Sequence, residues 1–140
     1  MALSKDRNTE ARTKGPLNVF KVKGATTIYA GALVAVDANG FLLPAADAAN
    51  LKVMGRADEQ VVNAGADGAK SCRVEQGVFK WANSGAAAVD QAALGHLVYA
   101  EDDQTVRKTG GTNNIKAGLA LQIDPDDAGI WVATFPDGNW

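Results

Sequence analysis

The chain contains very few side chains of the kinds that usually carry catalysis or hold metal ions. It has a single cysteine, Cys72, and a single histidine, His96. A lone cysteine cannot close an internal disulfide, so the stability of the fold has to come from packing or assembly. Structural zinc needs several cysteine or histidine ligands, and a hydrolase triad has neither a G-x-S-x-G segment nor a second histidine to draw on. We therefore expect no enzyme activity, no cofactor and no metal site.

Segments with recognisable targeting or ligand-binding chemistry are also missing. The N-terminus has no apolar signal-peptide core, and no apolar run approaches the roughly 18 residues that a membrane helix needs. Residues 109–114 are glycine-rich but lack the lysine of a phosphate-binding loop. The acidic clusters at 101–103 and 124–127 lack the spacing of a calcium loop and are typical of hairpin turns. We expect a protein that is made in the cytosol and has no membrane partner.

Charge is distributed unevenly along the chain. Residues 1–23 hold six basic and two acidic side chains, a net charge of +4, whereas residues 24–140 hold eight basic and fourteen acidic ones, a net charge of −6. Such a division suggests a basic arm and an acidic body with different partners. Because an acidic body repels phosphates, nucleic acid is not expected as a partner.

The first residues read as the arm. Residues 1–16 are polar and show no sustained apolar periodicity, which predicts a flexible, extended N-terminal arm, with weak helix as the alternative. Residues 17–140 then form a single β domain. We expect the arm to bind a partner through Lys5, Arg7, Arg12 and Lys14, and deletion of residues 1–14 to leave folding nearly unchanged.

From Leu17 onward the sequence changes to short runs rich in Val, Ile, Phe and Trp, separated by Gly, Asn and Asp about every ten residues. This spacing predicts an all-β fold, an antiparallel β-sandwich of the jelly-roll kind, with a small β-barrel as the alternative. Residues 86–94 could add a helical turn or two. The expected strands cover residues 19–23, 27–36, 41–43, 51–57, 72–76, 78–82, 96–100, 105–108, 115–123 and 130–135.

A faint internal repeat runs through these strands. Residues 31–37 (GALVAVD) recur 64 residues later as residues 95–101 (GHLVYAE). Two related halves facing each other would explain the repeat, and chance similarity between short β runs is the alternative. The further matches are Gly-x-Ala at 55–57 and 118–120, and a glycine before an apolar-aromatic pair at 77–79 and 129–131.

A few side chains have an environment that the pattern predicts. Cys72 lies in the alternating apolar register of a strand, which favours a buried role, and His96 begins a strand, which favours a surface or interface position. Trp81 and Trp131 lie within strands, and one or both are expected to serve the core. Trp140 ends the sequence, where its ring would remain in water unless it docks on a partner, so we expect it to be an anchor.

Three glycine-based motifs point to a family. Residues 26–44 (TTIYAGALVAVDANGFLLP) contain G-x-x-V-x-x-D-x-x-G, residues 74–79 read V-x-x-G-V-F, and residues 117–120 read A-G-x-A. In this order, across residues 26–135, the chain resembles the head decoration (cement) proteins of tailed bacteriophages.

The resemblance implies a structural virion protein that binds the outer surface of an assembled capsid and bridges neighbouring subunits of the major capsid protein. Such a protein is made in the host bacterial cytoplasm and ends on the outer capsid surface. Its partners would be the major capsid protein and itself, with a homodimer slightly favoured over a homotrimer. The rival interpretation is a carbohydrate-binding or adhesin-type β module on a virion or cell surface, with tryptophan rings as sugar platforms.

Overall fold

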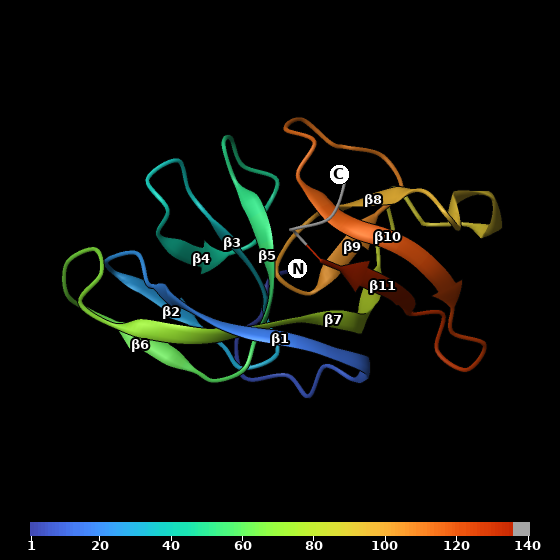
Figure 1. Ribbon diagram of the computed structural model, residues 1–140. Helices are drawn as coiled ribbons and strands as arrows, with labels where there is room; N and C mark the ends of the chain where they lie inside the picture. The colour runs from blue at the N-terminus through green and yellow to red at the C-terminus, as the bar shows by residue number, and fades with distance from the viewer. Residues whose placement is uncertain (136–140) are drawn as a thin grey trace.

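The computed structural model describes residues 1–135, without the side chains of residues 12–16, and is drawn in Figure 1. It contains eleven strands and one short 3₁₀ helix within that range. The strands are β1 (Ala11–Lys21), β2 (Thr26–Ile28), β3 (Leu33–Val36), β4 (Leu42–Pro44), β5 (Lys52–Ala57), β6 (Val61–Asn63), β7 (Ser71–Asn83), β8 (Leu97–Ala100), β9 (Thr105–Arg107), β10 (Lys116–Ile123) and β11 (Ile130–Thr134), and the helix is η1 (Gln91–Ala93).

The all-β prediction is confirmed, and the sheet closes into a small β-barrel. Strand β7 pairs with β11, β11 with β10, β10 with β8, β8 with β9, and β9 returns to β7. The barrel is the alternative considered from the sequence, and a jelly-roll arrangement is not confirmed. All of these pairings are antiparallel except that of β7 with β9, which is parallel.

Strand β7 is the longest element and replaces two strands expected on either side of Gly77. Gly77 has a φ of +156°, which a glycine adopts without strain, so the strand continues through it. Before Gly77 the strand pairs with β5, where Glu75 faces Arg56. From Gly77 onward it pairs with β11, where Gly77 faces Thr134. The glycine therefore marks a change of partner within one strand.

The internal repeat is confirmed by the strand registers. In the β3–β5 pair Val34 faces Gly55, and in the β8–β10 pair Val98 faces Gly118. The register shifts immediately beside both glycines. The next pair also matches, because β3 meets β4 as β8 meets β9. Strands β1, β3, β4, β5 and the start of β7 thus correspond to the end of β7 and to β8, β9, β10 and β11.

The first half also forms a ring of the same kind. In the second half Asn83 at the end of β7 lies parallel to Val106 of β9. In the first half Val22, just after β1, forms a parallel bridge with Leu42 of β4. Strand β7 belongs to both rings. Its first residues pair with β1 and β5 in the first half, and its last residues pair with β11 and β9 in the second.

One of the expected matches in the repeat is wrong. Gly77 and Gly129 do not correspond, because Ala57 faces Val74 in the first half as Ala120 faces Val132 in the second. The glycine before an apolar-aromatic pair recurs in the sequence without sharing a position in the fold.

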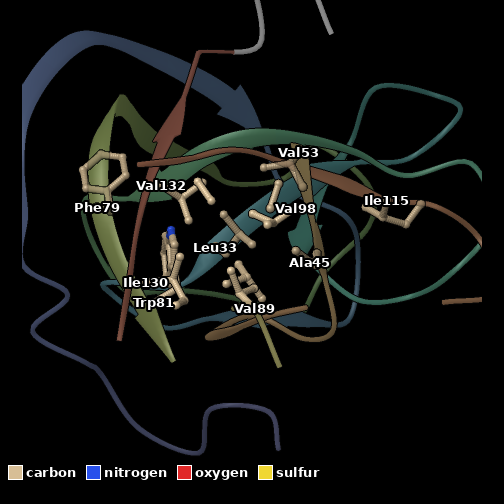
Figure 2. Close-up of a cluster of buried hydrophobic side chains, with 14 of the residues drawn as sticks. Leu33, Ala45, Val53, Phe79, Trp81, Val89, Val98, Ile115, Ile130 and Val132 are labelled. Carbon is tan, nitrogen blue, oxygen red and sulfur yellow. The ribbon is translucent and has the colours of Figure 1, made fainter. Parts of the chain in front are cut away.

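Two clusters of buried side chains fill the molecule. The larger contains Trp81 and Phe79, whose rings meet edge to face with centroids 6.2 Å apart. Figure 2 shows Leu33 in the middle of this cluster, between side chains of both halves. The smaller cluster surrounds Cys72 inside the first half. The buried positions expected for Trp81, Trp131 and Cys72 are confirmed.

The expected division between an arm and a body does not coincide with a boundary in the structure. Strand β1 begins at Ala11 and pairs with β7 as far as Lys21, so residues 16 and 17 lie inside one strand. Before it, the N–H of Arg7 donates to the carbonyl of Ala30, and the buried hydroxyl of Thr9 donates to the carbonyl of Gly31 at 2.6 Å. The polar residues that suggested an arm in water are bonded to backbone groups of the body.

Candidate protein-binding surface

Arg7, expected as a partner contact, packs against the core. Its guanidinium carbon lies 5.9 Å from the centroid of the Trp81 ring, and its Nη1 donates to Thr9 Oγ1 at 2.8 Å and to the Lys80 carbonyl at 3.3 Å. Burial lowers the pKa of Arg7 from its ordinary value. This arrangement holds the first residues onto the barrel and gives Arg7 a structural role, while its contact with a partner stays a prediction.

The structure does not bring the other predicted contact residues together. Lys5 is exposed, in the stretch before β1. Arg12 and Lys14 belong to β1, where Lys14 faces Gly77, and their side chains lie outside the described part. Trp140 lies outside the described residues. Among the described side chains of this set, Lys5 alone is placed to meet a partner.

A second arginine completes the attachment of the first residues. Arg56 of β5 donates from Nη1 to the Thr9 carbonyl at 2.6 Å, and its Nη2 lies 3.4 Å from Glu75 Oε1. Its guanidinium carbon lies 4.7 Å from the Phe79 ring centroid. With Arg7 it lines a shallow pocket between the N-terminal segment and the end of β5. Nη1 of Arg7 and both terminal nitrogens of Arg56 are engaged within the protein, which makes the pocket a joint between segments.

The groups with reactive chemistry are separated from one another. Cys72 is fully buried, and desolvation, followed by the charge of Glu59, raises the pKa of its thiol to about 12. His96 is exposed just before β8. Within residues 1–135, no three His, Cys, Asp or Glu side chains are grouped so that they could hold a metal ion. No helix in that range is long and apolar enough to cross a membrane.

The acidic cluster between β10 and β11 builds its own turn, as expected. Asp124 accepts hydrogen bonds from the N–H of Asp126 at 2.9 Å and from the indole of Trp131 at 3.1 Å. Lys80 donates to Asp127 at 2.8 Å, and this bond lowers the pKa of the Asp127 carboxyl. These carboxylates fix the end of the barrel.

The surface that remains is the outer edge of β1. Among the described strands β1 pairs with β7 alone, so its other edge has no strand partner. Figure 1 shows β1 running along the outside of β7. On this strand Leu17 is 50% exposed and Val19 is 65% exposed. Large apolar side chains on an unpaired strand are the usual mark of a protein-binding edge.

The backbone of Val19 points toward this open edge. Val19 faces Arg73 of β7. The N–H of Arg73 donates to Glu59 Oε2 at 3.0 Å, and its carbonyl accepts from the N–H of Asp58 at 2.8 Å, so both groups are turned away from β1. Two directly opposed residues of an antiparallel pair either exchange both hydrogen bonds or neither. Val19 therefore directs its own N–H and carbonyl away from β7.

Comparison with known proteins adds no information about this surface. Neither protein-family models, nor curated proteins, nor solved structures gave a match to this chain.

The chain itself contains a precedent. Because Asn18 faces Val74 as Phe79 faces Val132, Val19 in the first half corresponds to Lys80 in the second. The N–H of Lys80 donates to the carbonyl of Glu10 at 3.0 Å, and residues 11–14 continue along that edge of β7. The edge that is covered by residues 10–14 in the second half is thus uncovered at β1 in the first.

The charge pattern, on which the predicted contact residues depend, does not identify Leu17 and Val19. The signal was present in the alternation, since Val19 shares a face with Lys21 and is therefore an apolar residue on the wet side of the strand. An apolar residue at such a position indicates either a partner or a chance exposure. Only the pairing of β1 shows that the position also lies on an open edge.

Proposed function

We propose that this chain is a structural protein of a tailed-phage head that binds the outer surface of the assembled capsid and bridges neighbouring major capsid protein subunits. The observation that carries the proposal is the open edge of β1, where exposed apolar side chains coincide with unpaired backbone groups at Val19. Such an edge binds other proteins by strand addition and needs no catalytic group. The protein acts without enzyme activity, as a binding partner alone.

The positions behind the family resemblance have a structural reason in this fold. Gly31 and Gly40 of the motif in residues 26–44 have φ values of +87° and +85°, and Gly118 of the motif in residues 117–120 has a φ of +148°. Gly77 of the motif in residues 74–79 has a φ of +156°. These are backbone conformations that glycine adopts without strain. The resemblance therefore rests on positions that determine the chain path, which supports a shared fold with decoration proteins.

The rival carbohydrate-binding function loses two of its three proposed sugar platforms. Trp81 is fully buried and Trp131 is 5% exposed, so neither ring presents a face to a sugar. Trp140 lies outside the described residues. Stacking on sugars requires an exposed ring, whereas strand addition requires the edge that β1 provides.

Bridging of several capsid subunits also explains how a small binding edge could attach the protein firmly. A protein that contacts several subunits at once multiplies a modest affinity by the effective concentration of its second site. The capsid places identical subunits around local symmetry axes, and we propose that this protein sits there as a symmetric oligomer, a dimer in preference to a trimer.

Co-sedimentation with purified heads of the phage that encodes the chain tests this function. We expect saturable binding to mature heads and weaker binding to precursor shells whose lattice has not expanded. A glycan array and host cell envelopes provide the comparison. Binding to glycans with none to heads would overturn the proposal in favour of the adhesin function.

A further inference from the structure

We infer that the open edge of β1 binds an extended, acidic segment of a partner protein, which adds to the sheet as an antiparallel strand beside Leu17 and Val19. This inference deepens the proposed function, on which it rests, by naming what the capsid partner has to offer. It concerns the backbone edge and its charge, not the exposed side chain of Lys5.

The geometry calls for a strand as the occupant. Natural sheets protect their edges with short strands, charged side chains or covering loops. Strand β1 has eleven residues, and at Leu17 and Val19 it exposes apolar side chains beside the outward-facing backbone of Val19. A strand added there satisfies the backbone groups and covers both side chains. A partner surface without an extended strand cannot do both at once.

The direction of the added strand follows from the internal repeat. On the edge of β7 that corresponds to this edge of β1, residues 11–14 run antiparallel, with Ala11 opposite Phe79 and Lys14 opposite Gly77. The same fold therefore already accommodates an antiparallel strand at this position. The first half has the same edge without a segment of its own chain to cover it.

Charge decides between an acidic partner and a second copy. Strand β1 contains the basic residues Arg12, Lys14 and Lys21 and no acidic residue. Two copies joined through β1 would set these basic strands against each other, and like charges opposed across a strand pair destabilise it. An acidic segment pairs with them favourably instead.

The test uses the whole protein with a synthetic peptide probe. The probe alternates valine and threonine at its centre and carries glutamates at both ends, and its matched control carries lysines at the ends. By NMR, we expect the glutamate peptide to shift the amide signals of Leu17 and Val19 saturably and to slow exchange of the Val19 amide. Since opposite charges across a strand pair stabilise it and like charges destabilise it, the lysine peptide should bind about tenfold more weakly.

Two variants separate the edge from the rest of the surface. Val19→Pro removes the outward N–H without touching a bond to β7 and should abolish binding of the glutamate peptide. Val19→Asp keeps the N–H but opposes the acidic probe, so it should reverse the preference toward the lysine peptide even where the proline variant folds poorly. Leu121→Ala, on an exposed apolar residue of β10, is the control and should leave binding unchanged.

Several outcomes would overturn the inference. These are unshifted Leu17 and Val19 signals at millimolar glutamate peptide, equal binding of both peptides, or a dimer of the free protein that Val19→Pro dissociates. The last result would assign the edge to a second copy. Binding of the unmodified protein to phage heads is measured separately, so a failed peptide test leaves the proposed function standing while removing this account of it.

Discussion

Gly55 and Gly118 occupy the same position in the two halves of the chain. Gly55 has a φ of +146° and Gly118 a φ of +148°, and each lies against a carbonyl of the neighbouring strand. A Cβ on Gly55 would overlap the carbonyl oxygen of Glu75, and one on Gly118 would overlap that of Ala133. The match in conformation and contact extends the internal repeat from strand order to single atoms.

Replacing either glycine by alanine should destabilise the protein strongly. Gly55→Ala and Gly118→Ala both force an overlap with backbone and an unfavourable φ, and we expect each to cost about 3 kcal/mol of unfolding free energy. Gly85→Ala is the control, because nothing lies within 4 Å of its Cβ position, and should change stability by less than about 0.5 kcal/mol. Urea denaturation gives the comparison. Equal stability of the Gly118→Ala variant and the unmodified protein would contradict the assigned backbone.

The repeat shows how far the sequence alone leads. Its first segment, residues 31–37 and 95–101, was visible because apolar alternation and a leading glycine survive in both halves. The match of Gly77 with Gly129 was wrong because a glycine before apolar residues is common in β proteins and carries no register. The sequence leaves a closed barrel as the alternative to a sandwich and does not choose between them, since closure depends on the parallel pairing of β7 with β9, and local patterns do not specify strand partners.

The N-terminal segment differs from its sequence-based expectation for a related reason. Residues 1–10 are polar, and polarity alone predicts exposure to water. In the structure Thr9 is buried because its hydroxyl bonds to Gly31, and Arg7 lies over Trp81. Buried polar groups with partners look the same in a sequence as solvated ones, so only the positions of their partners distinguish the two cases.

Thr9→Val tests whether the first residues are part of the folded body. The variant keeps the shape of the side chain but leaves the Gly31 carbonyl without its hydroxyl donor, which should lower the unfolding free energy by about 1–3 kcal/mol. Asn8→Ala, at the exposed neighbouring position, should be nearly neutral. Deletion of residues 1–14 should cost more than either change, because it also uncovers the edge of β7. A deletion variant as stable as the full chain would restore the interpretation as an arm.

Cys72 should resist modification for as long as the protein is folded. With a pKa of about 12 and no exposed surface, its thiolate is present in only roughly one molecule in ten thousand at pH 8, out of reach of reagents. We expect no labelling by iodoacetamide over hours at that pH and complete labelling in guanidinium chloride. Rapid labelling of the native protein would show that the core around β7 opens.

The loop at residues 110–114 should loosen in acid through Asp47. Its carboxylate accepts hydrogen bonds from the N–H groups of Thr112 and Asn113, both at 2.9 Å, and these bonds hold its pKa below the ordinary value. Because the folded state favours the ionised form, the stabilisation is present above the unfolded pKa of about 3.9 and is lost as pH falls through the lower folded pKa.

Amide signals of Thr112 and Asn113, followed by NMR from about pH 6 to about pH 2, measure this change. They should move and exchange faster in acid, whereas Asp47→Asn, which cannot ionise, should show no such titration. Thr112 and Asn113 signals that stay constant across this range in the unmodified protein would contradict the assigned hydrogen bonds.

Replacement of Lys5 and of Arg7 by alanine should affect different properties of the protein, capsid binding for Lys5 and stability for Arg7. Arg7 lies over Trp81 and donates to Thr9, so its loss should lower the unfolding free energy by about 1–2 kcal/mol, from the lost packing and hydrogen bonds together. Lys5 is exposed, so Lys5→Ala should leave stability within about 0.5 kcal/mol.

If the basic start of the chain attaches to an acidic capsid surface, Lys5→Ala should instead weaken co-sedimentation with heads and make the residual binding less sensitive to salt, because one screened charge contact has been removed. Measured in the same salt series at a temperature where both variants are folded, Arg7→Ala should retain the salt dependence of the unmodified protein. If the Arg7→Ala variant loses that salt dependence while keeping full stability, the guanidinium of Arg7 contacts the partner and does not stabilise the core.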